Sequence, residues 1–201
     1  TAKYFVPRLL GSFCAQYPDI DIRLEVLNRD GVVQRLRENL DDLYVMSMPP
    51  ADLDLEDHVF LSNPLVLVAW QGHRLAKRRR IALADLGDER FVLRERGSGT
   101  RAAMERCFDE HQAQMQIFME MPSNETIKQA VMANMGLSFL SQRTIRHELA
   151  AGYMVLLDVV DTPIQGKWQV IHLKNKKLSP TLKAFKHFLL EQGGALIDTW
   201  S

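Results

Sequence analysis

FVLRERGSGTR, at residues 91–101, has the pattern of an apolar strand, a turn that contains glycines, and a helix that begins with hydroxyl residues. MEMPSNETIK, at residues 119–128, repeats this pattern with a strand end, a proline and another polar helix start. The N-terminus of a helix carries unpaired N–H groups and a partial positive charge. Two such helix starts at one edge of a sheet would form a site for a small anion, which favours a ligand-binding domain over a catalyst.

The composition is that of an ordinary globular domain, since 46% of the 201 residues are apolar and 25% are charged. The 25 Lys and Arg residues balance the 25 Asp and Glu residues, whereas a domain that binds nucleic acid by itself usually has a basic excess. No apolar run is long enough to cross a membrane. Cys14 and Cys107 fit a reducing compartment, although one disulfide between them is also compatible with the sequence. We therefore expect a cytoplasmic protein without a membrane partner.

The first part of the chain has the periodicity of alternating helices and strands. A helix is predicted from Thr1 to about Gln16, and a strand is predicted over residues 20–27, where apolar and charged residues alternate. A second helix begins at Asn28, and residues 43–48 form a short buried strand. This order predicts an α/β unit with a parallel sheet.

A second α/β unit follows a long apolar stretch at residues 59–70, which is broken by Ser62-Asn63-Pro64, and a polar loop at residues 71–80. Two such units joined by extended segments predict two lobes with a ligand cleft between them, because ligands bind outside the carboxyl ends of strands in such sheets. The remaining predicted elements are strand 91–94, helix 100–112, strand 115–121, helix 124–134, strand 137–140, helix 143–151, strands 155–160 and 167–174, and helix 179–192.

In their order and spacing, several segments resemble the effector-binding domain of LysR-type transcriptional regulators. These segments are YFVPRLLGSFCAQYPDIDIRLEV, DLYVMSMPP, NPLVLVAWQGHRLA, FVLRERGSGTR, SNETIKQAVMANMGLSFLS and LSPTLKAFKHFLL. The combination of RERGSGTRAAME with SNETIKQAV is most similar to regulators of carbon-fixation (RuBisCO, Calvin-cycle) operons. Regulators of inorganic-carbon uptake genes share much of it.

The resemblance implies an α/β, type-2 periplasmic-binding-protein-like fold, in which two Rossmann-like lobes are joined by two crossover strands. Residues 1–65 and 171–201 would form the first lobe, and residues 66–170 the second. The chain starts at Thr1 without an initiator methionine, so we expect a fragment that lacks the family's N-terminal winged helix-turn-helix domain and binds no DNA alone. Family members work as homodimers or homotetramers, and we expect dimer surfaces on the strand at residues 20–27 and the helix at residues 127–135.

The resemblance and the helix starts together give a set of effector-binding candidates. The helix starts near residues 1 and 28 could equally be ordinary caps, and Asn124 can either cap the helix that it begins or hydrogen-bond a ligand oxygen. In the second lobe, guanidinium forks and hydroxyls suit a phosphorylated metabolite or NADPH. The alternative is that the arginines face solvent or pair with Glu95 and Glu105. The candidates are Thr1, Ala2, Asn28, Arg29, Met48, Arg94, Arg96, Ser98, Thr100, Arg101, Ser123 and Asn124.

Other patterns indicate no specific chemistry. The basic run at residues 74–80 is most simply a solvated loop, the six histidines lack metal-ligand spacing, and no acid/base pair or nucleophile stands out. The sequence therefore predicts no catalytic residue, no metal and no cofactor beyond a non-covalent effector. A solute-binding protein of a transport system with the same fold is the alternative, and the sequence preceding Thr1 would distinguish the two.

Overall fold

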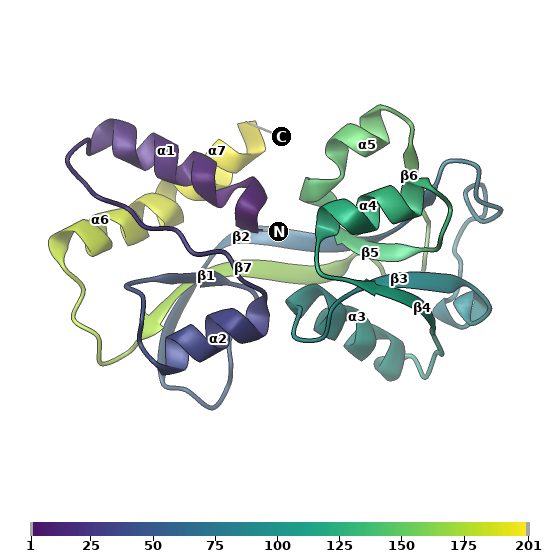
Figure 1. The fold of residues 1–201 in the computed structure, drawn as a ribbon, viewed down its shortest axis with the longest axis horizontal. Coiled ribbons are helices and arrows are strands. Elements are labelled where there is room, and N and C mark those ends of the chain that lie inside the picture. Colours follow the sequence, from purple (N-terminus) through teal and green to yellow (C-terminus); the bar gives the residue numbers. More distant parts are fainter. Residues whose placement is uncertain (1, 200–201) are drawn as a thin grey trace. The chain divides into compact units, whose positions relative to one another are not determined.

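The computed structural model describes residues 2–199, which divide into two units (Figure 1). Unit 1 comprises Thr1–Ser62 and Lys167–Ser201, and unit 2 comprises Asn63–Gly166. The chain enters unit 2 within strand β2 (Leu55–Trp70) and returns to unit 1 within strand β7 (Ile164–Leu173). The lobe boundaries expected from the sequence, at residues 65/66 and 170/171, fall within the same two strands.

In unit 1, aromatic side chains hold the first helix against a helix near the C-terminus. The ring centroid of Phe13 lies 4.9 Å from that of Phe185 and 5.4 Å from that of Phe188, so these rings form the centre of an apolar core. The elements of unit 1 are a 3-10 helix (Ala2–Tyr4), α1 (Val6–Gln16), α2 (Arg29–Arg37), β1 (Tyr44–Met46), α6 (Pro180–Phe188), a π-helical turn (Leu189–Gly193) and α7 (Gly194–Thr199).

Two predictions for unit 1 were wrong. Residues 20–27 form no strand, and Leu24 and Val26 are 41% and 48% exposed. Their alternation gives the segment one apolar face, but among the described residues no neighbouring strand pairs with it. The sheet is also not parallel here, since β1 pairs antiparallel with β7, with Val45 opposite Val170. A pattern along the chain indicates a strand but does not specify its partner or direction.

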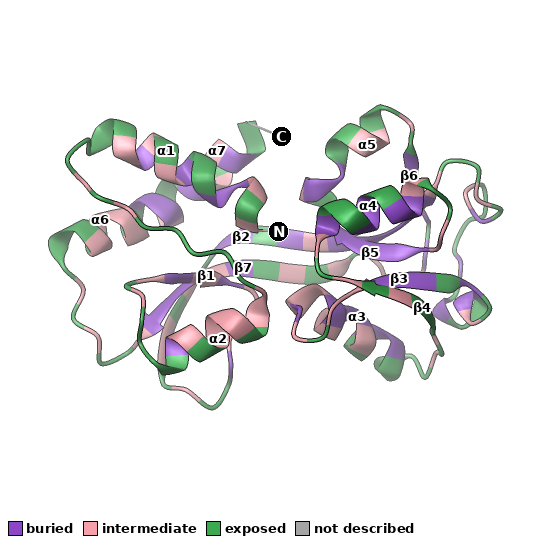
Figure 2. Cartoon of the chain, viewed as in Figure 1, coloured by how far each residue is buried: buried purple, intermediate pink, exposed green. Residues whose placement is uncertain are grey.

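In unit 2, the two repeated strand–turn–helix segments lie side by side. Strands β3 and β4 are parallel, and Arg94 at the end of β3 is opposite Met121 at the end of β4. Figure 2 shows β5 buried along its length, whereas much of β4 is exposed. The elements are a 3-10 helix (Leu83–Leu86), β3 (Arg90–Arg94), α3 (Gly99–Glu110), β4 (Gln116–Met121), α4 (Asn124–Met132), β5 (Ser138–Ser141), a 3-10 helix (Gln142–Thr144), α5 (Arg146–Ala150) and β6 (Met154–Leu156).

Strand β2 connects the two units without the predicted interruption at Ser62-Asn63-Pro64. It pairs antiparallel with β5 and with β6 in unit 2. Asn63 is buried, and its Oδ1 accepts a 2.6 Å hydrogen bond from the hydroxyl of Ser141 on β5. A buried partner for the polar side chain therefore lets the strand continue through a segment whose composition indicates a turn.

Candidate functional site

The candidate site in unit 2 lies where β3 and β4 end and α3 and α4 begin. Because parallel strands end at the same edge of a sheet, the pairing of Arg94 with Met121 brings both helix starts to one place. Arg94 directly joins them, since its Nη1 donates a 2.8 Å hydrogen bond to Oδ1 of Asn124, the first residue of α4. Two predicted site residues that are 30 positions apart in the sequence are therefore in contact.

Arg94 is also paired with the residue that follows it. Its Nε and Nη2 donate hydrogen bonds of 2.8 Å and 2.9 Å to the two carboxylate oxygens of Glu95. The Arg94 side chain is 13% exposed and that of Glu95 is 25% exposed. This bidentate geometry is the strong form of an arginine–carboxylate pair, and it cancels the charge of Arg94 in the structure.

The start of α3 has no side-chain cap. Ser98 is the N-cap residue and is 3% exposed, but its hydroxyl makes no capping hydrogen bond to the helix. The preceding Gly97 has φ +84°, a left-handed conformation that glycine adopts without strain. Thr100 is half-buried in the first turn. The first N–H groups of α3 therefore keep their capacity to bind an anion beside Arg94.

The start of α4 differs from the prediction by one residue. Ser123, not Asn124, is the cap, and its hydroxyl accepts a 3.2 Å hydrogen bond from the backbone N–H of Glu125. Asn124 is 2% exposed, and its side chain bonds with Arg94 instead. The site thus uses Asn124 to hold a guanidinium, a role that the spacing of the helix start did not indicate.

Arg101 lies inside the framework of the site. It is 4% exposed, and its guanidinium contacts carboxylate oxygens of Glu105 and Glu120 at 2.7 Å each. Its Nη1 also donates a 3.2 Å hydrogen bond to the carbonyl of Arg94. Burial disfavours the charged form, but the hydrogen bonds that Arg101 donates to both carboxylates outweigh it, so the pKa of Arg101 is raised. Sequence reasoning named the pairing with Glu105 as an alternative and missed Glu120, whose position on β4 no local pattern indicates.

Arg96 is exposed and takes no part in this network. It follows the Arg94–Glu95 pair in the turn that leads to Gly97 and α3. No hydrogen bond or ion pair with another described residue holds the Arg96 guanidinium, so it can move to meet an anion at the rim of the site. The structure thus separates the three arginines into a paired, an exposed and a buried one.

The unit 1 candidates form a separate group. Asn28 caps α2, and its Oδ1 accepts a 3.0 Å hydrogen bond from the N–H of Gly31. Arg29 follows, and its Nε donates a 2.8 Å hydrogen bond to the carbonyl of Met48, which has φ +55° after β1. The structure therefore brings Arg29 and Met48 together at the start of α2. Ala2 begins the first 3-10 helix, and Thr1 lies outside the described residues.

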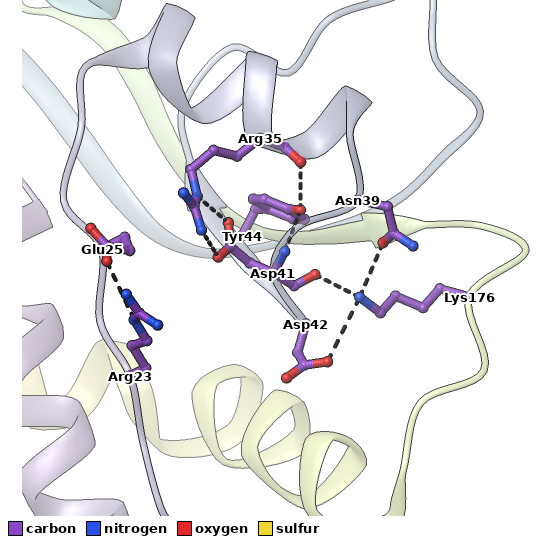
Figure 3. A network of polar contacts seen from close by, with 8 residues as sticks. All are labelled: Arg23, Glu25, Arg35, Asn39, Asp41, Asp42, Tyr44 and Lys176. Carbon is purple, nitrogen blue, oxygen red and sulfur yellow. Dashed lines mark hydrogen bonds and ion pairs between the residues drawn. The ribbon is translucent and has the colours of Figure 1, made fainter.

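A polar network at the far end of α2 was not predicted (Figure 3). Arg35 binds both carboxylate oxygens of Asp41, at 2.8 Å and 2.6 Å, and holds the pKa of that carboxyl below its usual range. The hydroxyl of Tyr44 donates to the carbonyl of Arg35 and accepts from the N–H of Asp41, both at 2.9 Å. Lys176 donates to the Asp41 carbonyl and to Asn39. The network fixes α2 to β1, so we assign it a structural role.

Nearby acids pair with part of the basic run at residues 74–80. Arg78 pairs with Asp85 at 3.0 Å, and Arg74 pairs with the carboxylate of Glu89. Within residues 2–199, no cluster of His, Cys, Asp and Glu side chains could hold a metal ion, and both cysteines are free thiols. No helix in the described part of the chain is both long and apolar enough to cross a bilayer.

Comparison with known proteins gives matches over nearly the whole chain. Residues 1–194 match the family described as LysR substrate binding domain. The chain is 44% identical to the transcriptional activator CmpR of Synechocystis over 98% of its own length and 64% of that protein. It is 42% identical to a RuBisCO operon transcriptional regulator of Acidithiobacillus ferrooxidans over 94% of this chain and 61% of that protein. The chain thus spans less than two thirds of the length of these curated relatives.

Solved structures agree with the sequence comparison. The regulatory domain of Synechocystis CcmR in complex with 2-PG has a TM-score of 0.90 and 43% identity, covering 94% of this chain and 91% of that one. The effector-binding domain of QuiR with shikimate has a TM-score of 0.82 and 25% identity, covering 94% and 90%. These matches confirm the expected type-2 periplasmic-binding-protein-like fold.

Proposed function

The chain belongs to the LysR substrate-binding-domain family, and we propose that it is the effector-sensing domain of a transcriptional regulator that controls carbon-fixation genes. The observation that carries the proposal is its similarity, at 42–44% identity, to two RuBisCO operon transcriptional regulators and to CmpR. The relatives are described as transcriptional regulators, so no observation favours the transport alternative and we propose no catalytic role. DNA would be bound in the cytoplasm by a separate part of the full-length protein.

The effector of this domain is a small phosphorylated metabolite, with 2-phosphoglycolate as the first candidate. Support comes from the 2-PG complex of the similar CcmR domain and from the chemistry of the unit 2 site. The uncapped start of α3 offers backbone N–H groups, and Arg94, Arg96 and Ser98 lie at the same turn. Guanidinium and backbone N–H groups are the donors that phosphate oxygens prefer. Ribulose 1,5-bisphosphate and NADPH are the further candidates.

Calorimetric titration of the chain with these metabolites tests the assignment. We expect saturable binding of at least one of them and much weaker binding of glycolate, which lacks the phosphate. Arg96→Gln should weaken binding about tenfold or more, because it removes a charged donor from the turn. The matched control is Arg106→Gln, because Arg106 is exposed and lies further along α3, away from the helix start. If no phosphorylated metabolite binds, the proposed effector class is wrong.

The unit 1 candidates are tested in the same assay. We propose that Asn28, Arg29 and Met48, together with Thr1 and Ala2, also contribute to effector binding. Arg29→Gln removes the hydrogen bond to the Met48 carbonyl and should weaken binding without a large loss of stability, since the Arg29 side chain is 27% exposed. Unchanged affinity in Arg29→Gln would exclude the Arg29 side chain from effector binding.

We also propose that the chain forms a homodimer through residues 20–27, with the helix at residues 127–135 of the second copy as the expected partner surface. The segment has no regular secondary structure, and Leu24, Val26 and Leu27 are 41–48% exposed. Sedimentation velocity should show that Leu24→Glu lowers the dimer fraction, because a charge enters an apolar contact. Leu40→Glu is the matched control, because Leu40 is 54% exposed elsewhere in unit 1. Equal dimer fractions in both variants would exclude this surface.

A further inference from the structure

Arg94 ends β3 and contacts the first residue of α4, yet in the structure its charge is already matched. Both carboxylate oxygens of Glu95 accept hydrogen bonds from Arg94, at 2.8 Å and 2.9 Å. An anionic ligand that approaches Arg94 therefore meets a neutral pair, and it meets the negative charge of Glu95 within a few ångströms. Attraction of the ligand therefore does not explain the presence of Glu95 at a site for anions.

Glu95 is not needed to hold Arg94 in place. The backbone of Arg94 is fixed by pairing with Met121 on β4 and by the hydrogen bond from Arg101 to its carbonyl. Its guanidinium is held by the 2.8 Å hydrogen bond to Asn124, which is 2% exposed. Arg94 thus has three anchors apart from Glu95. Glu95 adds a negative charge to the site.

The Glu95 side chain is also placed so that it can move away from Arg94 and into solvent. It is 25% exposed and lies at the first position of the turn that runs to Ser98, where the N–H of Ser98 bonds with the Glu95 carbonyl at 3.2 Å. Rotation of the side chain into water would break the two hydrogen bonds to Arg94, and hydration of the carboxylate would offset part of that cost. The backbone of the turn would not have to change.

We propose that Glu95 is a built-in counter-ion of the effector site, which an anionic effector displaces from Arg94 when it binds. The inference rests on the proposed function of this site. Because the effector must outcompete an intramolecular carboxylate, a phosphate group with about two charges near neutral pH binds in preference to a singly charged carboxylate. Glu95 therefore lowers affinity and increases selectivity for phosphorylated ligands.

Titration of the wild type and of Glu95→Gln with 2-phosphoglycolate and with inorganic phosphate tests the inference. We expect Glu95→Gln to bind both about tenfold more tightly or better, because glutamine keeps the shape and removes the charge. Glu110→Gln is the matched control, since it removes one negative charge from the exposed last residue of α3. That helix is about 18 Å long, so the charge is screened from the site. The double variant Arg94→Gln/Glu95→Gln should not show this increase in affinity.

The two ligands separate this inference from the proposed function. Unchanged or weaker phosphate binding by Glu95→Gln overturns the counter-ion role, whether or not the wild type binds 2-phosphoglycolate. A gain that persists in the double variant also overturns it, because Arg94 would then not be the group released. If the wild type binds no phosphorylated metabolite but Glu95→Gln gains phosphate affinity through Arg94, the counter-ion role holds and the effector assignment fails.

Discussion

Replacing Arg101 by alanine should destabilise the protein by about 3 kcal/mol. The guanidinium is 4% exposed and holds Glu105, Glu120 and the Arg94 carbonyl at 2.7 Å, 2.7 Å and 3.2 Å. Its removal leaves two carboxylates without their shared cation and one carbonyl without a donor. Breaking a fully buried ion pair costs about 3–5 kcal/mol. The value here is at the low end because the Glu105 and Glu120 side chains are 44% and 41% exposed and can be solvated.

Urea denaturation followed by circular dichroism measures this loss, and calorimetry should show a melting temperature lower by about 6–12 °C for a chain of this size. Arg96→Ala is the control, because Arg96 is exposed, and its unfolding free energy should stay within about 0.5 kcal/mol of the wild type. An Arg101→Ala variant within about 1 kcal/mol of the wild type would refute the reasoning. It would show that the three contacts contribute little beyond what water supplies.

Three further predictions concern other parts of the fold. Trp168→Phe should lower the unfolding free energy in urea by only about 1–2 kcal/mol, the cost of the smaller ring. The buried indole Nε1 of Trp168 has no hydrogen-bond partner among the described residues, so no hydrogen bond is lost; a loss above about 4 kcal/mol would contradict this reasoning. Gly136→Ala should lower the unfolding free energy by about 2 kcal/mol or more in the same assay, since a Cβ there would lie 2.6 Å from a backbone carbonyl oxygen of β3. Gly87→Ala is the control and should leave the unfolding free energy unchanged, because the atom nearest to its Cβ would be 3.7 Å away. The pKa of Glu56 is lowered from 4.5 to about 2, chiefly by the hydrogen bond from Lys186, so this carboxylate stabilises the fold above pH 4.5 and the contribution is lost as the pH falls to about 2. Glu56→Gln should therefore flatten the acid limb of a stability–pH curve, and an unchanged limb would contradict the shift.

The order of elements in unit 2 could be predicted from sequence because each has a strong local signal. Apolar runs predicted β3 and β5, and glycines followed by hydroxyl residues predicted the start of α3. The same reasoning failed at residues 20–27, where the alternation is strong but no strand among the described residues pairs with the segment. It also failed at Asn63, where a buried hydrogen bond to Ser141 carries β2 through a segment that resembles a turn. Local pattern decides which conformation is favoured, and pairing decides whether it forms a sheet.

The candidate site shows the same division. The sequence by itself placed three arginines and several hydroxyls at the two helix starts, because residue type and spacing are local properties. Only the tertiary structure decided their partners: Asn124, 30 positions away, holds Arg94, and Glu120 on the neighbouring strand holds Arg101. The parallel pairing of β3 and β4 sets these distances, and at such distances burial and ion pairing determine which guanidinium remains available to an anion. The sequence thus determined which charged and hydroxyl groups lie at the two helix starts. The packing of the strands determined which of the guanidinium groups are paired and which one stays exposed.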